Sequence, residues 1–293
     1  MPHATPFLDR LRPSRPARRT LLAVAALVLA IATVQSGAAL AKGLFTAAGP
    51  AGVTALRTGF AAVMLGLAWQ PWREPLSARQ VKLLLAYGAS LGLMNLLFYL
   101  SLQRLPLGIA VAIELVGPLS LALLHSRRKT HLAWLALAGI GLASLLPIGA
   151  VSNPLDPLGV LLAAGAGTSW ALYIQFGHHL AGAMPAARAS ALGMAVAAIL
   201  TLPAGILQGG RMLLTPTVLL PGLAIALLSS AIPYSLEMIA LKRLPPRVFG
   251  VLMSLEPAGA ALSGALFLGE GLTLRQGLAI ACIILASAGS TTR

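Results

Sequence analysis

Residues 229–264 read SSAIPYSLEMIALKRLPPRVFGVLMSLEPAGAALSG, two apolar segments joined by the basic corner 242–247. Each apolar segment contains one carboxylate, Glu237 in the first and Glu256 in the second. The whole chain has only seven acidic residues, so two of them in apolar surroundings need a reason. This stretch predicts two neighbouring helices that each bury a charged group.

The composition extends this prediction to the whole chain of 293 residues. It is 58% hydrophobic and 10% charged, with a mean hydropathy of +0.87. A soluble domain usually has about 25% charged residues. Apolar runs of about 17–24 residues, separated by short polar links, fit helices that cross a ~30 Å hydrocarbon core. We therefore expect an all-α integral membrane protein in a lipid bilayer.

The net charge of +14 could indicate nucleic-acid binding. Lys and Arg, however, gather at the ends of the apolar runs, as the positive-inside rule expects for a membrane protein. Cys282 is the only cysteine, and no Cys/His cluster has the spacing of a metal site. We expect no nucleic-acid partner, metal or cofactor.

Ten spans account for the apolar runs. Residues 1–19 are rich in Pro and Arg and predict a disordered leader. Residues 21–41 could be a signal peptide, but this run is longer than the usual h-region of about 7–15 residues. The spans cover about residues 21–41, 52–69, 83–102, 107–124, 132–148, 158–176, 189–207, 218–241, 248–268 and 274–289.

The distribution of basic residues predicts the orientation. With the N terminus inside, the inside segments contain 16 Lys and Arg residues and the outside links contain 4. This bias places both termini in the cytoplasm.

An internal repeat divides the chain. Residues 104–106 and 243–245 both read Arg-Leu-Pro, 139 positions apart, and at the same offset Pro118 aligns with Pro257. The halves, 20–150 and 151–293, would each have five helices. An odd number places the second half upside down, which is an inverted repeat with a substrate site at mid-membrane. Chance similarity of apolar sequence is the alternative.

Charges near the bilayer centre are functional candidates, because each costs about 2.5–3.5 kcal/mol on insertion scales. The repeat brings Glu114 and Glu256 onto matching helix faces, and pairs Asn95 with Tyr234. The polar candidates are Glu114, Glu256, Glu237, Arg57, Asn95, Tyr99, Tyr234 and Gln35, and the candidate helix-breaking residues are Pro118 and Pro257.

These residues suggest a polar cavity for a small zwitterionic amino acid. Carboxylates, or carbonyls freed by proline, would receive its ammonium group, and a cation or a helix N terminus would receive its carboxylate. Two alternatives for Arg57 are a structural ion pair with a glutamate and snorkelling to the helix end. Glu237 could instead anchor the adjacent basic corner.

Several stretches resemble the drug/metabolite transporter superfamily with its two EamA repeats. They are GVTALR at 52–57, NLLFYLS at 95–101, PLGIAVAIELVGPL at 106–119, PYSLEMIAL at 233–241 and MSLEP at 253–257. The resemblance covers about residues 20–292. It implies a secondary transporter that exports small amino acids of the threonine/homoserine type by alternating access, with protons as the coupling ion.

Other functions stay open from the sequence. A transporter of this fold could carry a drug, a nucleobase or a sugar metabolite. A membrane-embedded enzyme or structural subunit is the other class, but no catalytic motif is visible, so we do not expect an enzyme. The sequence also leaves open a homodimer.

Overall fold

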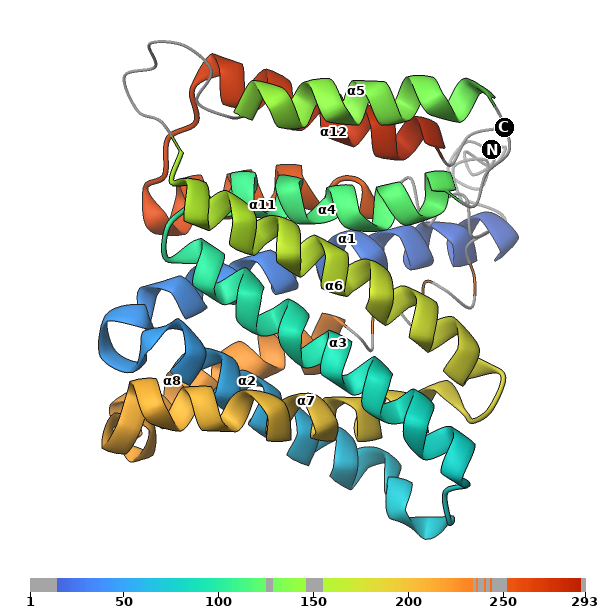
Figure 1. Cartoon of the computed structure of the whole chain (residues 1–293), viewed down its shortest axis with the longest axis vertical. Helices are drawn as coiled ribbons and strands as arrows, with labels where there is room; N and C mark the ends of the chain where they lie inside the picture. Colours follow the sequence, from blue (N-terminus) through green and yellow to red (C-terminus); the bar gives the residue numbers. More distant parts are fainter. Residues whose placement is uncertain are drawn as a thin grey trace, which may run out of the picture.

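A computed structural model describes residues 15–124, 129–145, 155–233, 236, 240, 243 and 252–290. Every regular element in these ranges is helical (Figure 1). The α-helices are α1 (Arg15–Gly43), α2 (Phe45–Trp69), α3 (Ala78–Leu102), α4 (Leu107–Leu124), α5 (Lys129–Leu145), α6 (Pro157–Ala181), α7 (Ala186–Gly209), α8 (Pro216–Ala226), α11 (Glu256–Leu268) and α12 (Leu274–Ser290). Three short turns complete them: η2 (Pro71–Arg73), η3 (Gly210–Leu214) and the π-helical η4 (Leu227–Ala231).

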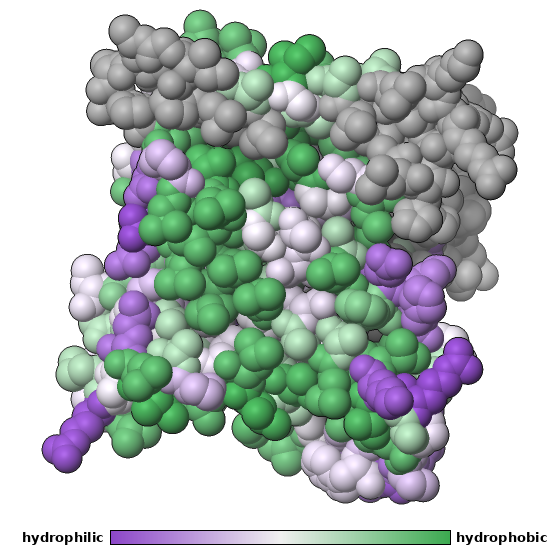
Figure 2. Space-filling view, viewed as in Figure 1, coloured by the Kyte–Doolittle hydropathy of each residue, from purple (hydrophilic) through white to green (hydrophobic). Residues whose placement is uncertain are grey.

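The helices have membrane character. Five helical stretches are long and apolar enough to cross a bilayer, and shorter apolar helices cover 107–121, 216–231 and 274–286. Figure 2 shows hydrophobic residues over the middle of one face, with hydrophilic residues along two opposite edges where helices end. The all-α membrane class is thus confirmed, while the count of ten spans and the inverted repeat stay predictions.

Helix α1 begins earlier than the sequence suggested. It starts at Arg15, so the last five residues of the leader are helical rather than disordered. The physical reason is local, since proline is favoured in a first helical turn and alanine and arginine are good helix formers. Residues 1–14 lie outside the described residues.

The junction between α1 and α2 also differs from the expected link at 48–50. The chain turns at Leu44, and α2 then bends at Gly49, whose φ of 68° suits glycine. Pro50 begins the straight part of α2, where its missing N–H has no helical partner to lose. Gln208 of α7 accepts a hydrogen bond from the Ala51 amide at 2.7 Å, so the second half caps this bend.

Helices that lie far apart in the sequence pair to build the core. Helix α2 packs along α7, α5 along α12, and both α3 and α4 along α6. Helices α4 and α6 meet backbone to backbone, because a Cβ on Gly117 would lie 2.0 Å from the Gly167 carbonyl oxygen. This close crossing fixes the part of α4 that carries Glu114.

Candidate functional site

Arg57 lies near the middle of α2 and is buried, with 8% of its surface exposed. Its Nη2 donates to the Ser229 carbonyl at 2.9 Å, and Nη1 donates to the Tyr99 hydroxyl at 3.4 Å. Its Nε donates to the Ser230 hydroxyl at 3.4 Å. Arg57 thereby joins α2, α3 and η4 through three neutral oxygen atoms.

The sequence around η4 explains why a backbone carbonyl is available to Arg57. Pro233 has no N–H, so the Ser229 carbonyl loses the donor that an α-helix would supply four residues later. In the π-helical turn, the Ile232 amide instead reaches back to the Leu227 carbonyl. Such turns inside helices often mark functional sites. Here the turn directs a free carbonyl towards a buried cation.

Glu114 faces the same interior from α4, with 8% of its surface exposed. Its carboxylate accepts no hydrogen bond from the part of the chain that the structure describes. It interacts electrostatically with Arg57, but no ion pair joins the two among the described residues. Glu114 is therefore a buried carboxylate with open acceptor positions.

Pro118 lies inside α4, which continues to Leu124. Its missing N–H frees the Glu114 carbonyl. That carbonyl is turned towards α6, because a Cβ on Gly167 would lie 2.4 Å from its oxygen. The carboxylate of Glu114, rather than its carbonyl, is the group left to meet a ligand.

Tyr99 and Asn95 share one face of α3, one turn apart. Tyr99 is fully buried, and its ring centroid lies 5.4 Å from the Arg57 guanidinium carbon, a cation–π contact. Asn95 is also buried and donates to the Leu91 carbonyl at 2.8 Å within its own helix. Tyr99 thus belongs to the Arg57 cluster, whereas the Asn95 amide is bonded locally.

Gln35 and Glu256 lie around the contact of α1 with α11. Helix α11 begins at Glu256, with Pro257 in its first turn, so a helix starts inside the predicted span 248–268. Glu256 is buried and has a polar partner. Buried Gln35 lies beside Gly259, one turn further along α11. The other two candidates, Tyr234 and Glu237, lie outside the described residues.

Snorkelling of Arg57 to the helix end does not fit the structure, whereas a structural ion pair stays open, because Glu237 lies outside the described residues. A snorkelling side chain would extend to the helix end, but this guanidinium is buried among Tyr99, Ser229 and Ser230. A structural ion pair would need a carboxylate within bonding distance, and no described glutamate or aspartate supplies one. Ser229 and Ser230 were not predicted, because serine is common in membrane helices and a Ser-Ser pair before a proline does not by itself indicate a site.

A second polar cluster, also missed, joins helix ends away from the centre. Lys42, at the end of α1, contacts Glu270 at 2.5 Å and donates to the Leu105 carbonyl at 2.7 Å. The other oxygen of Glu270 accepts from the Leu107 amide at 2.7 Å. These bonds tie the corner between α3 and α4 to α1 and to the link between α11 and α12.

At the same corner, Arg104 donates to Asp156, the N-cap residue of α6, at 2.6 Å. The Arg104 hydrogen bond and the helix amides of Leu158 and Gly159 hold the pKa of the Asp156 carboxyl below its ordinary value of 3.8. The carboxylate therefore stays ionised as a helix cap.

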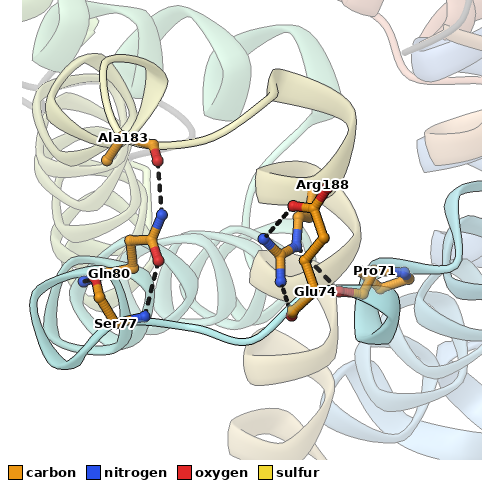
Figure 3. Close-up of polar contacts among 6 residues, drawn as sticks. All are labelled: Pro71, Glu74, Ser77, Gln80, Ala183 and Arg188. Carbon is orange, nitrogen blue, oxygen red and sulfur yellow. Dashed lines mark hydrogen bonds and ion pairs between the residues drawn. The ribbon is translucent and has the colours of Figure 1, made fainter.

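The opposite helix ends have their own network (Figure 3). Arg188 at the start of α7 is buried and donates to the Pro71 carbonyl at 3.0 Å and to the Glu74 carboxylate at 3.0 Å. Gln80 in the first turn of α3 donates to the Ala183 carbonyl at 2.6 Å. These contacts tie the link between α2 and α3 to the link between α6 and α7.

A groove of ≈ 320 Å³ runs between α4 and α6. It is lined mainly by apolar side chains, so it offers little to a charged ligand. The lining residues are Ile113, Val116, Gly117, Ser120, Leu121, Ala164, Thr168 and Ala171. In the described part of the chain, no three His, Cys, Asp or Glu residues group as a metal site would require.

Known proteins resemble this chain closely. The model of the EamA-like transporter family matches residues 157–292. The threonine/homoserine exporter RhtA of Escherichia coli strain K12 is 51% identical over 270 residues, 92% of this chain and 91% of the exporter. RhtA of Salmonella typhimurium strain LT2 has the same identity and coverage. These relatives are exporters rather than enzymes.

One solved crystal structure is 22% identical, with a TM-score of 0.60, and the match covers 92% of this chain and 95% of that one. At this identity the likeness shows a shared fold and nothing about the substrate.

Proposed function

The chain belongs to the EamA-like transporter family, and we propose that it exports small amino acids of the threonine and homoserine type across a bacterial inner membrane. The observation that carries the proposal is the 51% identity to threonine/homoserine exporters over 92% of the chain. The buried Arg57 and Glu114 support it, because intramembrane charges mark substrate or ion pathways.

The proposed transport cycle is alternating access in a ten-span fold with inverted halves and cytoplasmic termini. The packing supports this fold, since the second helices of the two halves pack together, as do the fifth helices (α2 with α7, α5 with α12; Figure 1). The excess of basic residues in the inside segments supports the orientation.

An efflux assay tests the substrate. The chain is produced in a bacterial strain that lacks its own threonine and homoserine exporters, and its insertion is verified in membrane fractions. We expect higher tolerance to external threonine and homoserine and a lower intracellular level of both. Unchanged tolerance with verified insertion would contradict the substrate assignment. A panel including nucleobases, sugar phosphates and drugs identifies another cargo if there is one.

Proton coupling is the finer part of the proposal. Glu256, Glu114 and Glu237 are the candidate proton carriers, and Glu256 is the first to test because it lies at a helix break. Glu256→Gln is expected to abolish the dependence of export on a pH gradient in liposomes while substrate exchange continues. A variant with intact pH-gradient dependence would exclude Glu256 as the carrier.

A further inference from the structure

We infer that the site binds both charges of an α-amino acid, with the substrate carboxylate on two N–H groups of Arg57 and its ammonium group on the Glu114 carboxylate. The inference rests on the proposed export function and adds which residue binds the carboxylate of the substrate and which binds its ammonium group. It follows from the N–H donors of Arg57 and the carboxylate oxygens of Glu114 that have no hydrogen-bond partner among the described residues.

The hydrogen bonds of Arg57 indicate how the substrate carboxylate is bound. A guanidinium has five N–H donors in a rigid fork, and three of them are used by Ser229, Ser230 and Tyr99. Because Nη1 and Nη2 each donate one hydrogen bond, each retains one N–H without a partner among the described residues. Two donors on neighbouring nitrogens match the two oxygens of a carboxylate.

The three oxygens also fix the direction of the fork. They come from α3 and η4, so they hold the guanidinium at three points without neutralising its charge. A carboxylate partner from the protein would have cancelled that charge. Among the described residues no carboxylate forms an ion pair with Arg57, so the site keeps a positioned cation for an anionic group from outside.

Glu114 is the proposed partner of the substrate ammonium group. Its carboxylate is buried, accepts no hydrogen bond from the described residues and interacts electrostatically with Arg57 without contact. Its position is rigid, because Gly117 and Gly167 lock α4 against α6 one turn away. An ammonium group would provide up to three donors to this acceptor.

Arg57 and Glu114 carry opposite charges that interact electrostatically, and no ion pair joins them. An α-amino acid carries its ammonium and carboxylate on the same carbon, so it offers one partner to each of these charges. Binding then replaces water on two buried charges with a partner for each, which a neutral or singly charged metabolite cannot do.

Ligand analogues on the wild-type protein give the first test, and they need no variant. Binding of L-threonine, threonine amide and N-acetylthreonine is measured with purified protein in liposomes. Threonine amide lacks the carboxylate and N-acetylthreonine lacks the ammonium group. We expect both analogues to bind about ten- to a hundredfold more weakly than threonine, as for the loss of a charged hydrogen bond. Equal binding of either analogue would overturn the inference.

Variants then assign each end. Arg57→Gln should reduce the preference for threonine over threonine amide and keep the preference over N-acetylthreonine. Glu114→Gln should reduce the preference for threonine over N-acetylthreonine and keep the preference over threonine amide. If either residue had a purely structural role, its variant would bind all three ligands more weakly by the same factor. That result would also overturn the assignment. Lys82→Gln removes an exposed cation from the start of α3 and is the matched control.

Two further outcomes separate the inference from the proposed function. If Arg57→Gln does not fold, Arg57→Lys retains the charge without the fork and should lose part of the same preference. If the wild type transports another α-amino acid, the assignment of threonine fails, and the amide and N-acetyl forms of that amino acid repeat the test. Transport of a cargo that is not a zwitterion defeats the inference as well.

Discussion

Arg57 keeps a full charge inside the bundle because neutral oxygens replace part of its water shell. The hydroxyls of Tyr99 and Ser230 and the carbonyl of Ser229 accept its hydrogen bonds, and the Tyr99 ring adds a cation–π contact. Each of these interactions lowers the cost of burial without removing the charge. A residue in this state is prepared to bind an anion.

Gly117 gives a prediction at this scale. Gly117→Ala should destabilise the protein, since its Cβ would lie 2.0 Å from the Gly167 carbonyl oxygen. Overpacking of this kind costs about 1–3 kcal/mol. The free energy of unfolding in detergent is the measurement. Gly139→Ala is the control, because nothing lies within 4 Å of its Cβ, and the two variants should not behave alike.

The sequence identified Arg57, Tyr99 and Glu114 because charged and polar residues stand out in apolar runs. It could not identify Ser229, since a serine is common in membrane helices and only the fold shows that Arg57 reaches its carbonyl. Glu270 was missed for the same reason, because its partner Lys42 is 228 residues away.

At the scale of elements, η4 and the helix before it form an interrupted span. Pro233 removes the N–H that an α-helix would offer to the Ser229 carbonyl, and this carbonyl accepts a hydrogen bond from Arg57 instead. The Ser229 hydroxyl is also buried, and no described residue forms a hydrogen bond with it. An unsatisfied buried group costs about 1–3 kcal/mol. This unsatisfied group therefore lowers the free energy of unfolding at the place where η4 contacts Arg57.

Pro233→Ala is therefore expected to stabilise the protein and to impair transport. Alanine restores an N–H that can bond the Ser229 carbonyl, and that bond competes with Arg57. The unfolding temperature should rise while the initial rate of threonine efflux falls. Pro203→Ala, also inside a helix but in α7, is the control and should raise stability without the loss of transport. A Pro233→Ala variant with normal efflux would contradict this role of the turn.

Helix bounds could be predicted well where a polar link clearly separates two apolar runs. The expected span 107–124 coincides with α4, and the expected span 158–176 begins one residue after the start of α6 at Pro157. The junction at Leu44 could not be predicted, because Gly49-Pro50 looks like a link in the sequence. Only a long-range contact, from Gln208 to the Ala51 amide, stabilises it as a bend within α2.

At the scale of the whole molecule, polar contacts gather at two opposite edges. Lys42 and Glu270 join helix ends at one edge, and Arg188 and Glu74 join them at the other (Figures 1 and 3). The apolar surface lies between these edges (Figure 2). This arrangement matches a slab of hydrocarbon crossed by the helices.

Reporter fusions test the orientation. A fluorescent protein fused after Arg293 should fluoresce, and alkaline phosphatase at the same position should be inactive, because we expect a cytoplasmic C terminus. Alkaline phosphatase inserted in the link at 210–215 should be active, since that link is expected outside. The reverse pattern at both positions would invert the proposed topology.

The self-pairing of helices has a consequence for the origin of the chain. A two-fold axis brings each element at the axis against its own copy. Helix α2 packs on α7 and α5 on α12, which are the same positions in the two proposed halves. If the proposed inverted repeat is correct, such contacts are those of two identical five-helix chains inserted in opposite directions. An ancestral gene for one half would then have encoded an antiparallel dimer, and fusion of two copies would have allowed Arg57 and Glu114 to arise on one side only.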